Sequence, residues 1–334
     1  MKTFTAIIVI LLTLCLGTFF VLYLDLLRFA SQPANQNALT AVFLVSPGER
    51  FNNIADNLYK LGVLKHPFKF RMLGRLKGYD KRIRAGEYLL STSMTPIQIL
   101  EILSSGKIRL RRVMVPEGYS LKQIATVVEQ TGLVSKEEFL RACRDKNLLN
   151  KLNIEATSFE GYLFPDTYYF PRGVSAEKII STMVKRFWSK FKPEWRKQAE
   201  ELGWSVHEVV TLASIIEKET GEPSERALIS SVFHNRLKRK MRLESDPTVI
   251  YGLKEFNGNL TRKHLNTPTP YNTYRIRGLP PGPISNPGAA AIRSALYPAV
   301  TEYLYFVSKR DRTHKFSTSI KEHNEAVRKY QLRR

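Results

Sequence analysis

The strongest constraint on this chain is an uncharged run of 21 residues near its start, residues 4–24. At 1.5 Å per residue, a helix of that length spans about 32 Å, which is enough to cross the hydrocarbon core of a bilayer. Lys2 precedes the run and Asp25 follows it. A short tail that carries Lys2 and the amino terminus most easily stays in the cytoplasm. We therefore expect a single-pass inner (plasma) membrane protein, with residues 1–30 as cytoplasmic tip and anchor and the rest outside the cytoplasm.

A cleaved signal peptide is the alternative explanation of the apolar run. Such a peptide usually has an apolar region of about 7–15 residues followed directly by a small-residue cleavage site. Here Ala30 and Ser31 provide small residues only after a second apolar stretch. The longer run favours an uncleaved anchor. The polar residues 31–40 then form a linker that leaves the membrane.

The charge of the chain predicts an anionic neighbour. Its 52 Lys and Arg residues against 30 Asp and Glu residues give a formal net charge of +22, which suits nucleic acid, lipid headgroups or an acidic polymer. A domain outside the cytoplasm meets no chromosome, so we expect no nucleic-acid partner. Lipid and cell-wall polymer remain, and the basic groups in residues 69–84 and 107–112 are expected to touch lipid phosphates. Two cysteines, Cys15 and Cys143, exclude a disulfide scaffold.

A pattern repeats after 70 residues. Five positions are identical at this spacing: Val45 and Val115, Gly48 and Gly118, Ile54 and Ile124, Ala55 and Ala125, and Gly62 and Gly132. Each copy predicts a strand, a glycine turn, an amphipathic helix, a second helix and a strand, and a further helix then begins near Thr95 or Ser175. Ser135 and Glu138 predict a capping box in the second copy. Chance similarity of two small α+β units is the alternative to a duplication.

The second half of the chain has a different pattern. Helices are predicted over residues 205–221, 223–240, 289–296 and 319–330, and a strand over residues 303–307. Between them lies a long irregular stretch, residues 265–288, which contains six prolines. Irregular segments of this length are usually functional or disordered. The apolar and aromatic residues in this stretch, such as Tyr271 and Leu279, favour an ordered loop.

One acidic residue lies where a helical wheel predicts core. With Val206 at 0°, Glu217 falls at about 20°, inside the apolar arc, and Glu219 falls at about 220°, at its edge. Burial raises the pKa of a carboxyl group and makes it a proton donor near neutral pH, which suits protonation of a glycosidic oxygen. The alternative is a structural carboxylate paired with Arg226 or Arg236. No phosphate loop, dinucleotide fingerprint, zinc-ligand pair or Gly-flanked nucleophilic serine is present, so we expect neither a cofactor nor a metal.

Several ordered motifs resemble one family. They are LASIIEKET at residues 212–220, NRL at 235–237, DPTVIYG at 246–252, YNTY at 271–274, GLPPGPI at 278–284 and NPG at 286–288. Together they resemble the YceG-like family, the MltG-type endolytic murein transglycosylases. The resemblance covers nearly the whole chain and includes the anchor and a LysM-like segment.

The resemblance implies a membrane-anchored lyase without cofactors that cuts nascent peptidoglycan strands internally. It would cleave the β-1,4 bond between N-acetylmuramic acid and N-acetylglucosamine, leave a 1,6-anhydro end and so terminate strand elongation. Glu217 matches the family's catalytic glutamate. It would protonate the leaving oxygen and then take the proton of the muramyl C6 hydroxyl as that oxygen attacks C1. The implied partners are glycan strands, the lipid bilayer and peptidoglycan synthases.

The expected fold class is α+β. A transmembrane helix precedes a LysM-like α+β subdomain (41–108), a second α+β unit that leads into the catalytic domain (109–200), and a mixed α/β catalytic region whose helix carries the catalytic glutamate (201–334).

The irregular loop and the neighbouring tyrosines supply the candidate substrate contacts: Tyr251, Asn272, Tyr274 and Asn286. Sugars stack on aromatic rings and bond to amides, although an Asn in a turn often bonds its own backbone. Asp246 is the remaining candidate, because it could lie near Glu217. It would be the second carboxylate of the first alternative function, a water-using muramidase. The second alternative is a non-catalytic wall-binding anchor built on the LysM-like segment.

Overall fold

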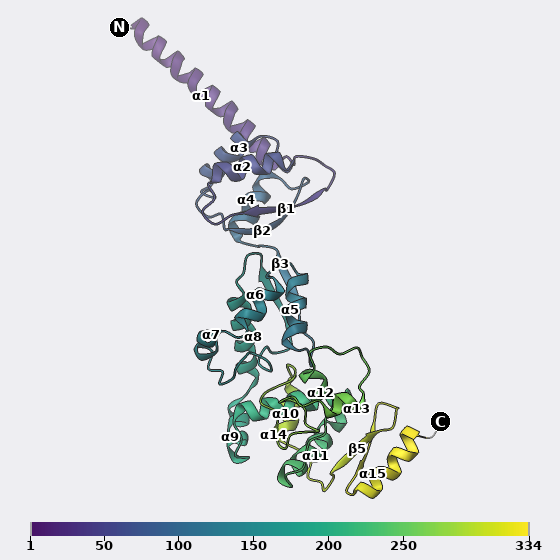
Figure 1. The fold of residues 1–334 in the computed structure, drawn as a ribbon. Helices are drawn as coiled ribbons and strands as arrows, with labels where there is room; N and C mark the ends of the chain where they lie inside the picture. The colour runs from purple at the N-terminus through teal and green to yellow at the C-terminus, as the bar shows by residue number, and fades with distance from the viewer. Residues whose placement is uncertain (1, 333–334) are drawn as a thin grey trace. The chain divides into compact units, whose positions relative to one another are not determined.

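The computed structural model describes residues 2–332, and the chain divides into two compact units between Arg111 and Arg112. Helices predominate in both units, and the strands of the described residues form three two-stranded sheets (Figure 1). This mixture of helix and sheet agrees with the α+β class expected from the sequence. Each unit is described below by itself.

The predicted apolar helix is present as α1, Lys2–Ser31. Within residues 2–332 it is the one helix long and apolar enough to cross a membrane, with a mean hydropathy of 2.8 in its most apolar part. Its last two turns differ from the rest, because Leu26 and Phe29 are buried in the core of the first unit. Asp25, just before them, pairs with Lys69 at 2.6 Å. The end of α1 is therefore fixed to the unit that follows it.

The rest of the first unit is a small α+β fold. Its elements are β1 (Thr40–Val45), α2 (Phe51–Lys60), α3 (Pro67–Leu76), β2 (Gly86–Ser91) and α4 (Pro96–Ser105). β1 and β2 are antiparallel, with Thr40 opposite Ser91 and Val45 opposite Gly86. Alternate residues point inward, so Phe43 and Val45 are buried against the helices. The expected helix start at Thr95 is confirmed, because Thr95 and Gln98 form a capping box at α4.

The second unit begins with the same order of elements. They are β3 (Leu110–Met114), α5 (Leu121–Gln130), α6 (Lys136–Ala142), α7 (Lys146–Lys151), β4 (Thr167–Pro171), α8 (Ala176–Lys190) and α9 (Pro193–Glu201). β3 pairs with β4 as β1 pairs with β2, and Ser175 caps α8 as Thr95 caps α4. The inserted α7 explains why the spacing between the copies drifts. Of the predicted capping box at α6, the bond from the Glu138 backbone N–H to Ser135 is present.

The remaining elements complete the second unit. They are α10 (Val206–Glu219), a short 3₁₀ turn (Pro223–Glu225), α11 (Arg226–Lys238), α12 (Asp246–Gly252), α13 (Arg262–Asn266), α14 (Ala289–Leu296), β5 (Tyr305–Ser308), β6 (His314–Ser317), α15 (Ile320–Val327) and a π-helical turn (Arg328–Leu332). The predicted helices and strand are present, with ends shifted by a few residues. β6, the antiparallel partner of β5, was not predicted, and neither were α12 and α13.

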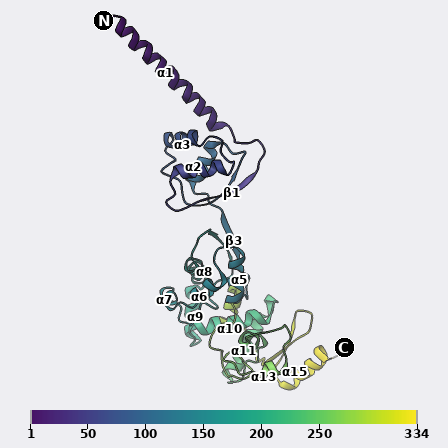
Figure 2. The ribbon, with the colours of Figure 1, turned by 45° about the horizontal axis from the view of Figure 1, so that its top comes forward.

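The central helix α10 is enclosed on all sides. Every residue from 209 to 216 is buried, including Ser214 on the side that the sequence makes polar. The proline-rich loop covers that side, since the Ile284 backbone N–H donates to Ser214 Oγ at 3.0 Å and Ser285 Oγ donates to the Ser214 carbonyl at 3.2 Å. The loop is thus irregular but ordered, and it is held on the helix that carries Glu217. Figure 2 shows α10 within the second unit from another side.

Candidate active site

Glu217 lies in the last turn of α10, and its side chain is only 6% exposed. Its Oε2 atom accepts a hydrogen bond from the backbone N–H of Gly288 at 2.9 Å. Its Oε1 atom accepts from Nη2 of Arg226 at 3.3 Å. The sequence left Arg226 and Arg236 open as partners, and the partner is Arg226. Arg236 instead donates to the Leu304 carbonyl and pairs with Glu244.

The pKa of Glu217 is raised above its ordinary value, chiefly because burial disfavours the charged form. The Gly288 hydrogen bond and the Arg226 guanidinium oppose this effect, while the nearby carboxylate of Glu117 adds to it. The group is therefore suited to hold a proton where an exposed glutamate would be ionised. It also has two donors that stabilise the carboxylate once the proton has left.

Glu117 is a second carboxylate at the site, and the sequence reasoning missed it. It lies in the turn between β3 and α5, with Oε2 3.9 Å from the same Arg226 nitrogen that contacts Glu217. Its side chain is 49% exposed. A Cβ atom at Gly288 would lie 1.8 Å from Oε1 of Glu117, so a side chain at residue 288 would displace Glu117 from its present position. Comparison of the two copies of the repeat could have revealed Glu117. At the equivalent position of the same turn, the first copy has Pro47 and not an acid.

A third acid, Glu160, is almost completely buried and was also missed. It accepts hydrogen bonds from the Leu121 backbone N–H at 3.0 Å, from Asn286 Nδ2 at 3.0 Å and from the Tyr251 hydroxyl at 3.1 Å. Burial raises the pKa of Glu160 to about 7, although these bonds act in the opposite direction. Donors from three separate segments, α5, α12 and the proline-rich loop, therefore converge on one carboxyl group.

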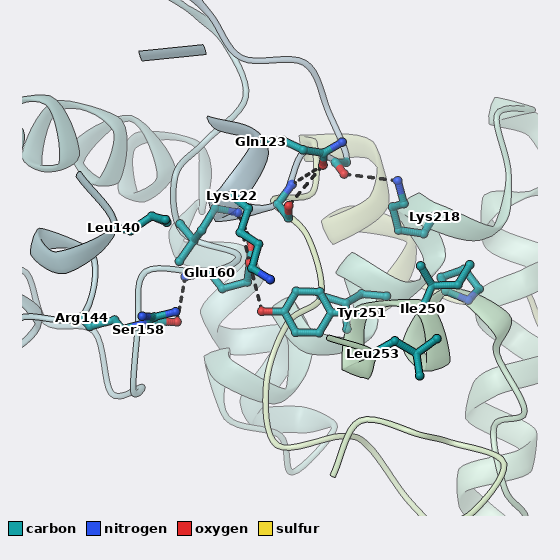
Figure 3. A pocket seen from close by; sticks show the side chains of 15 residues that line it. Lys122, Gln123, Leu140, Arg144, Ser158, Glu160, Lys218, Ile250, Tyr251 and Leu253 are labelled. Carbon is teal, nitrogen blue, oxygen red and sulfur yellow. Dashed lines mark hydrogen bonds between the residues drawn. The ribbon is translucent and has the colours of Figure 1, made fainter. Parts of the chain in front are cut away.

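Next to these acids is a cavity of about 660 Å³, within the size range of ordinary ligand pockets. The polar and charged residues of its lining include Lys122, Arg144, Glu160, Lys218 and Tyr251. Figure 3 shows the Tyr251 hydroxyl directed at Glu160, with Lys218 on a separate part of the lining. Gly118 and Lys218 also line the cavity. In the sequence, Gly118 directly follows Glu117 and Lys218 directly follows Glu217. Of the three acids, Glu160 is the one in the cavity lining, and the cavity reaches Glu117 and Glu217 only through these sequence neighbours.

The predicted substrate contacts fall into two groups. Tyr251 and Asn286 meet at Glu160, and only Tyr251 lines the cavity. Asn286 is 0% exposed, accepts from the Leu163 backbone N–H at 2.9 Å and donates to the Tyr119 carbonyl at 2.8 Å. Its amide therefore joins the proline-rich loop to the turn that carries Glu117.

The other group lies around Glu219. Asn272 is 0% exposed and donates to two backbone carbonyls of its own loop, as the loop-packing alternative expected. The Tyr274 hydroxyl donates to Asp246 at 2.7 Å. Ser245, next to Asp246, donates its hydroxyl to Glu219, whose pKa burial raises to about 7. The wheel placed Glu219 at the edge of the apolar arc, and the structure turns its carboxylate into the protein.

The acidic and histidine side chains of the described part of the chain do not gather into a metal site. No group of three or more His, Cys, Asp or Glu residues within 2–332 could hold a metal ion. The absence of a metal or cofactor from the reaction stays a prediction.

The fold and the site together define a class: an α+β protein with a long apolar helix near its start, a buried acid on a central helix and a neighbouring cavity that has a second buried acid in its lining. The model of the YceG-like family matches residues 43–329 of this chain. The chain therefore belongs to the YceG-like family, as the motifs indicated.

Two relatives carry the same name. The "Endolytic murein transglycosylase" of Bacillus subtilis (strain 168) is 35% identical over 316 residues, covering 90% of this chain and 87% of that protein. The protein of that name in Streptococcus pneumoniae serotype 2 (strain D39) is 30% identical, covering 83% of this chain and 56% of that protein. The crystal structure of a yceG-like protein from Listeria monocytogenes is 35% identical and has a TM-score of 0.61, covering 86% of this chain and 98% of that one.

Proposed function

We propose that this chain is an endolytic murein transglycosylase. It cleaves the β-1,4 bond between N-acetylmuramic acid and N-acetylglucosamine in nascent strands, leaves 1,6-anhydro ends and thereby terminates elongation. The names of two relatives, each aligned with more than four fifths of this chain, support the activity. The observation that carries the mechanism is the buried acid Glu217, which accepts hydrogen bonds from Gly288 and Arg226.

The geometry supports one group acting first as acid and then as base. The proton of Glu217 passes to the glycosidic oxygen while the bond from that oxygen to C1 of the muramyl residue breaks. The C6 hydroxyl oxygen of the same residue then bonds to C1, and its proton passes to Glu217. The acid is thereby regenerated and no water is consumed. Between the two steps, the Gly288 N–H and the Arg226 guanidinium stabilise the carboxylate.

A water-using muramidase is the second candidate function, and Glu117 is the observation that favours it. Hydrolysis with inversion needs a second carboxylate to activate a water molecule. Glu117 is half-exposed and shares Arg226 with Glu217, so it fits that role better than Asp246, which is bonded to Tyr274. The two functions differ in product, because hydrolysis leaves reducing ends.

We assign different tasks to the predicted contact residues. Tyr251 lies in the cavity lining and is proposed to contact sugar; Tyr274 and Asp246 lie outside that lining and stay proposed substrate contacts. Asn272 and Asn286 are proposed to position their loops, since both are completely buried.

The remaining expectations concern location and partners. We propose that α1 is an uncleaved anchor with its start in the cytoplasm and both units outside it, and that residues 41–108 form a LysM-like subdomain. Residues 109–200 would form an α+β segment that leads into the catalytic region (201–334). Glycan strands, the bilayer and peptidoglycan synthases are the proposed partners. A non-catalytic wall anchor stays the remaining alternative.

The test is cleavage of uncrosslinked glycan strands, followed by mass spectrometry of the products, with the unaltered chain and Glu217→Gln. We expect anhydro ends from the unaltered chain and a loss of about 10²–10⁴-fold in Glu217→Gln, with unchanged thermal unfolding. Glu219→Gln is the matched control, because it removes another desolvated acid from the same helix, and it should retain cleavage. Reducing ends as the main product would establish the muramidase instead. Full cleavage by Glu217→Gln would overturn the catalytic assignment.

A further inference from the structure

Helix α3 of the first unit has an unusual exposed face. Phe68, Met72 and Leu76 are 66%, 39% and 67% exposed. Their spacing of four residues places them in one row along the helix. Phe70 and Leu73 on the opposite side are buried in the core of the unit. The row is therefore an apolar surface that nothing in the unit covers.

This helix lies against the end of α1, at the level where the apolar run stops. Lys69 pairs with Asp25 at 2.6 Å, and the His66 and Phe29 rings are 6.0 Å apart. Asp25 is the first charged residue after residues 4–24. A bilayer spanned by α1 would end close to Asp25, so the ion pair places α3 at the membrane boundary.

The exposed row points away from the core of the unit. In both Figures 1 and 2, α3 lies on the side of the unit from which α1 emerges, while β1 lies farther from α1. Three basic residues, Lys65, Arg75 and Lys77, are exposed on or beside α3. An apolar row bordered by Lys and Arg is typical of helices that lie in the headgroup region of an anionic bilayer.

We propose that α3 is a second membrane contact, with Phe68, Met72 and Leu76 inserted among the headgroups of an anionic bilayer beside α1. The basic residues around the row contact lipid phosphates. This proposal rests on the membrane anchoring by α1 proposed above. Because one helix leaves a domain free to tilt, a second contact fixed to α1 sets how the first unit stands on the membrane.

We assign lipid as the occupant of the exposed row for two reasons. Helix α3 contacts the end of α1, and basic residues border the row. A second apolar surface of the same unit, the outer face of the sheet, provides the comparison. Val42, Leu44 and Leu89 are 44%, 45% and 52% exposed there, but β1 and β2 lie farther from α1 (Figure 1). Leu89 is thus a control of similar exposure and chemistry that should stay in water.

The experiment measures contact with lipid at three positions of the full chain, reconstituted in vesicles of phosphatidylcholine and phosphatidylglycerol. A fluorophore is attached to the native Cys15, or to Phe68→Cys or Leu89→Cys in a Cys15→Ala background. Cys143 stays in place, because it is 0% exposed and burial raises the pKa of its thiol. The Cys15→Ala chain alone provides the labelling blank. Lipids brominated at shallow and deep positions of the acyl chain, so that bromine reaches both the headgroup region and the depth of Cys15, and aqueous iodide are the two quenchers.

We expect lipid quenching at position 15 and several-fold more lipid quenching at position 68 than at position 89. Replacing phosphatidylglycerol with phosphatidylcholine should weaken the quenching at position 68 only. If position 15 is quenched by lipid while positions 68 and 89 behave alike, the α3 proposal is wrong and the anchor stands. If position 68 is shielded from both quenchers, a protein covers the row and lipid is not the occupant. If lipid does not reach position 15, the anchor proposal fails, and the α3 proposal fails with it.

Discussion

The Nη2 atom of Arg226 lies 3.3 Å from Oε1 of Glu217, and this guanidinium is the positive charge that acts on the buried acid. The same nitrogen lies 3.9 Å from Glu117. The two neighbours act on Glu217 in opposite directions, because the guanidinium favours its charged form and the carboxylate disfavours it. A single substitution should therefore lower the pKa of Glu217 if it removes Glu117, and raise it if it removes Arg226.

Removing either neighbour should move the pH profile of cleavage. Glu217 must be protonated to donate, so activity falls as the pH rises through its pKa. Glu117→Gln lowers that pKa and should shift the basic limb of kcat/KM to lower pH. Arg226→Gln raises it and should shift the limb to higher pH. The measurement is kcat/KM against pH, with Lys238→Gln on the exposed side of α11 as control. Shifts of both variants in the same direction would contradict the assignment.

Gly288→Ala should displace Glu117 and slow cleavage. The methyl group of Gly288→Ala would lie 1.8 Å from Glu117 Oε1, so Glu117 must move. Glu217 then loses the neighbouring carboxylate that raises its pKa. A displacement of about 1 Å in such a site costs up to about 10²-fold in rate. Gly221→Ala is the control, because nothing lies within 4 Å of its added Cβ. Equal rates for the two variants, with equal thermal unfolding, would show that the Glu117 contact has no part in catalysis.

Stability should fall between about pH 4.5 and pH 7. Glu160 and Glu219 have pKa values raised from 4.5 to about 7 in the folded chain, so their protonated forms favour folding. This stabilisation of the folded chain by protonation is complete below about pH 4.5, decreases as the pH rises and is lost above about pH 7. Each group contributes about 3 kcal/mol to this change, at about 1.4 kcal/mol per pH unit.

Glu160→Gln should therefore remove about half of that pH dependence. The measurement is the free energy of unfolding by urea at pH 5 and pH 8. The difference between the two pH values is diagnostic, because the absolute stability also changes when an amide replaces the carboxyl. Glu137→Gln, at an exposed acid of α6, is the control. An unchanged difference in Glu160→Gln would show that Glu160 titrates normally.

Asn286→Ala should destabilise the second unit. The substitution leaves the Leu163 N–H, the Tyr119 carbonyl and Glu160 each without one partner. A loss of about 2–3 kcal/mol is expected, since each buried polar group left unpaired costs about 1–3 kcal/mol. Urea unfolding measures it, with Asn259→Ala in an exposed loop as control. A raised KM with unchanged stability would instead mean that Asn286 contacts substrate directly.

Local patterns predicted the helices and the repeat well, because capping residues and apolar spacing act over a few residues. Thr95 and Ser175 begin helices as expected, and residues 289–296 form the predicted helix. The elements that were missed, β6 and the short helices α12 and α13, depend on partners elsewhere in the chain. β6 is four residues long and is a strand only because β5 lies beside it.

The residues of the candidate site also differ in whether local sequence could identify them. The wheel identified Glu217 because its position among apolar residues is visible within one helix. Glu117 and Glu160 were missed, since Glu117 is 100 residues away from Glu217 in sequence and Glu160 gains its donors from three separate segments. Asn272 and Asn286 were predicted as sugar contacts, and that prediction stays untested; in the structure both are buried and bond to the backbone of neighbouring segments.

The sequence by itself determined the apolar run, the repeated α+β pattern, the family and the one acid on an apolar face, because each is written in contiguous residues. Only the tertiary structure decided what surrounds that acid. It chose Arg226 over Arg236, brought Glu117 to the same guanidinium and covered α10 with the proline-rich loop. It also set α3 beside Asp25. A pKa depends on the charges and solvent around a group, and folding assembles those from distant parts of the chain.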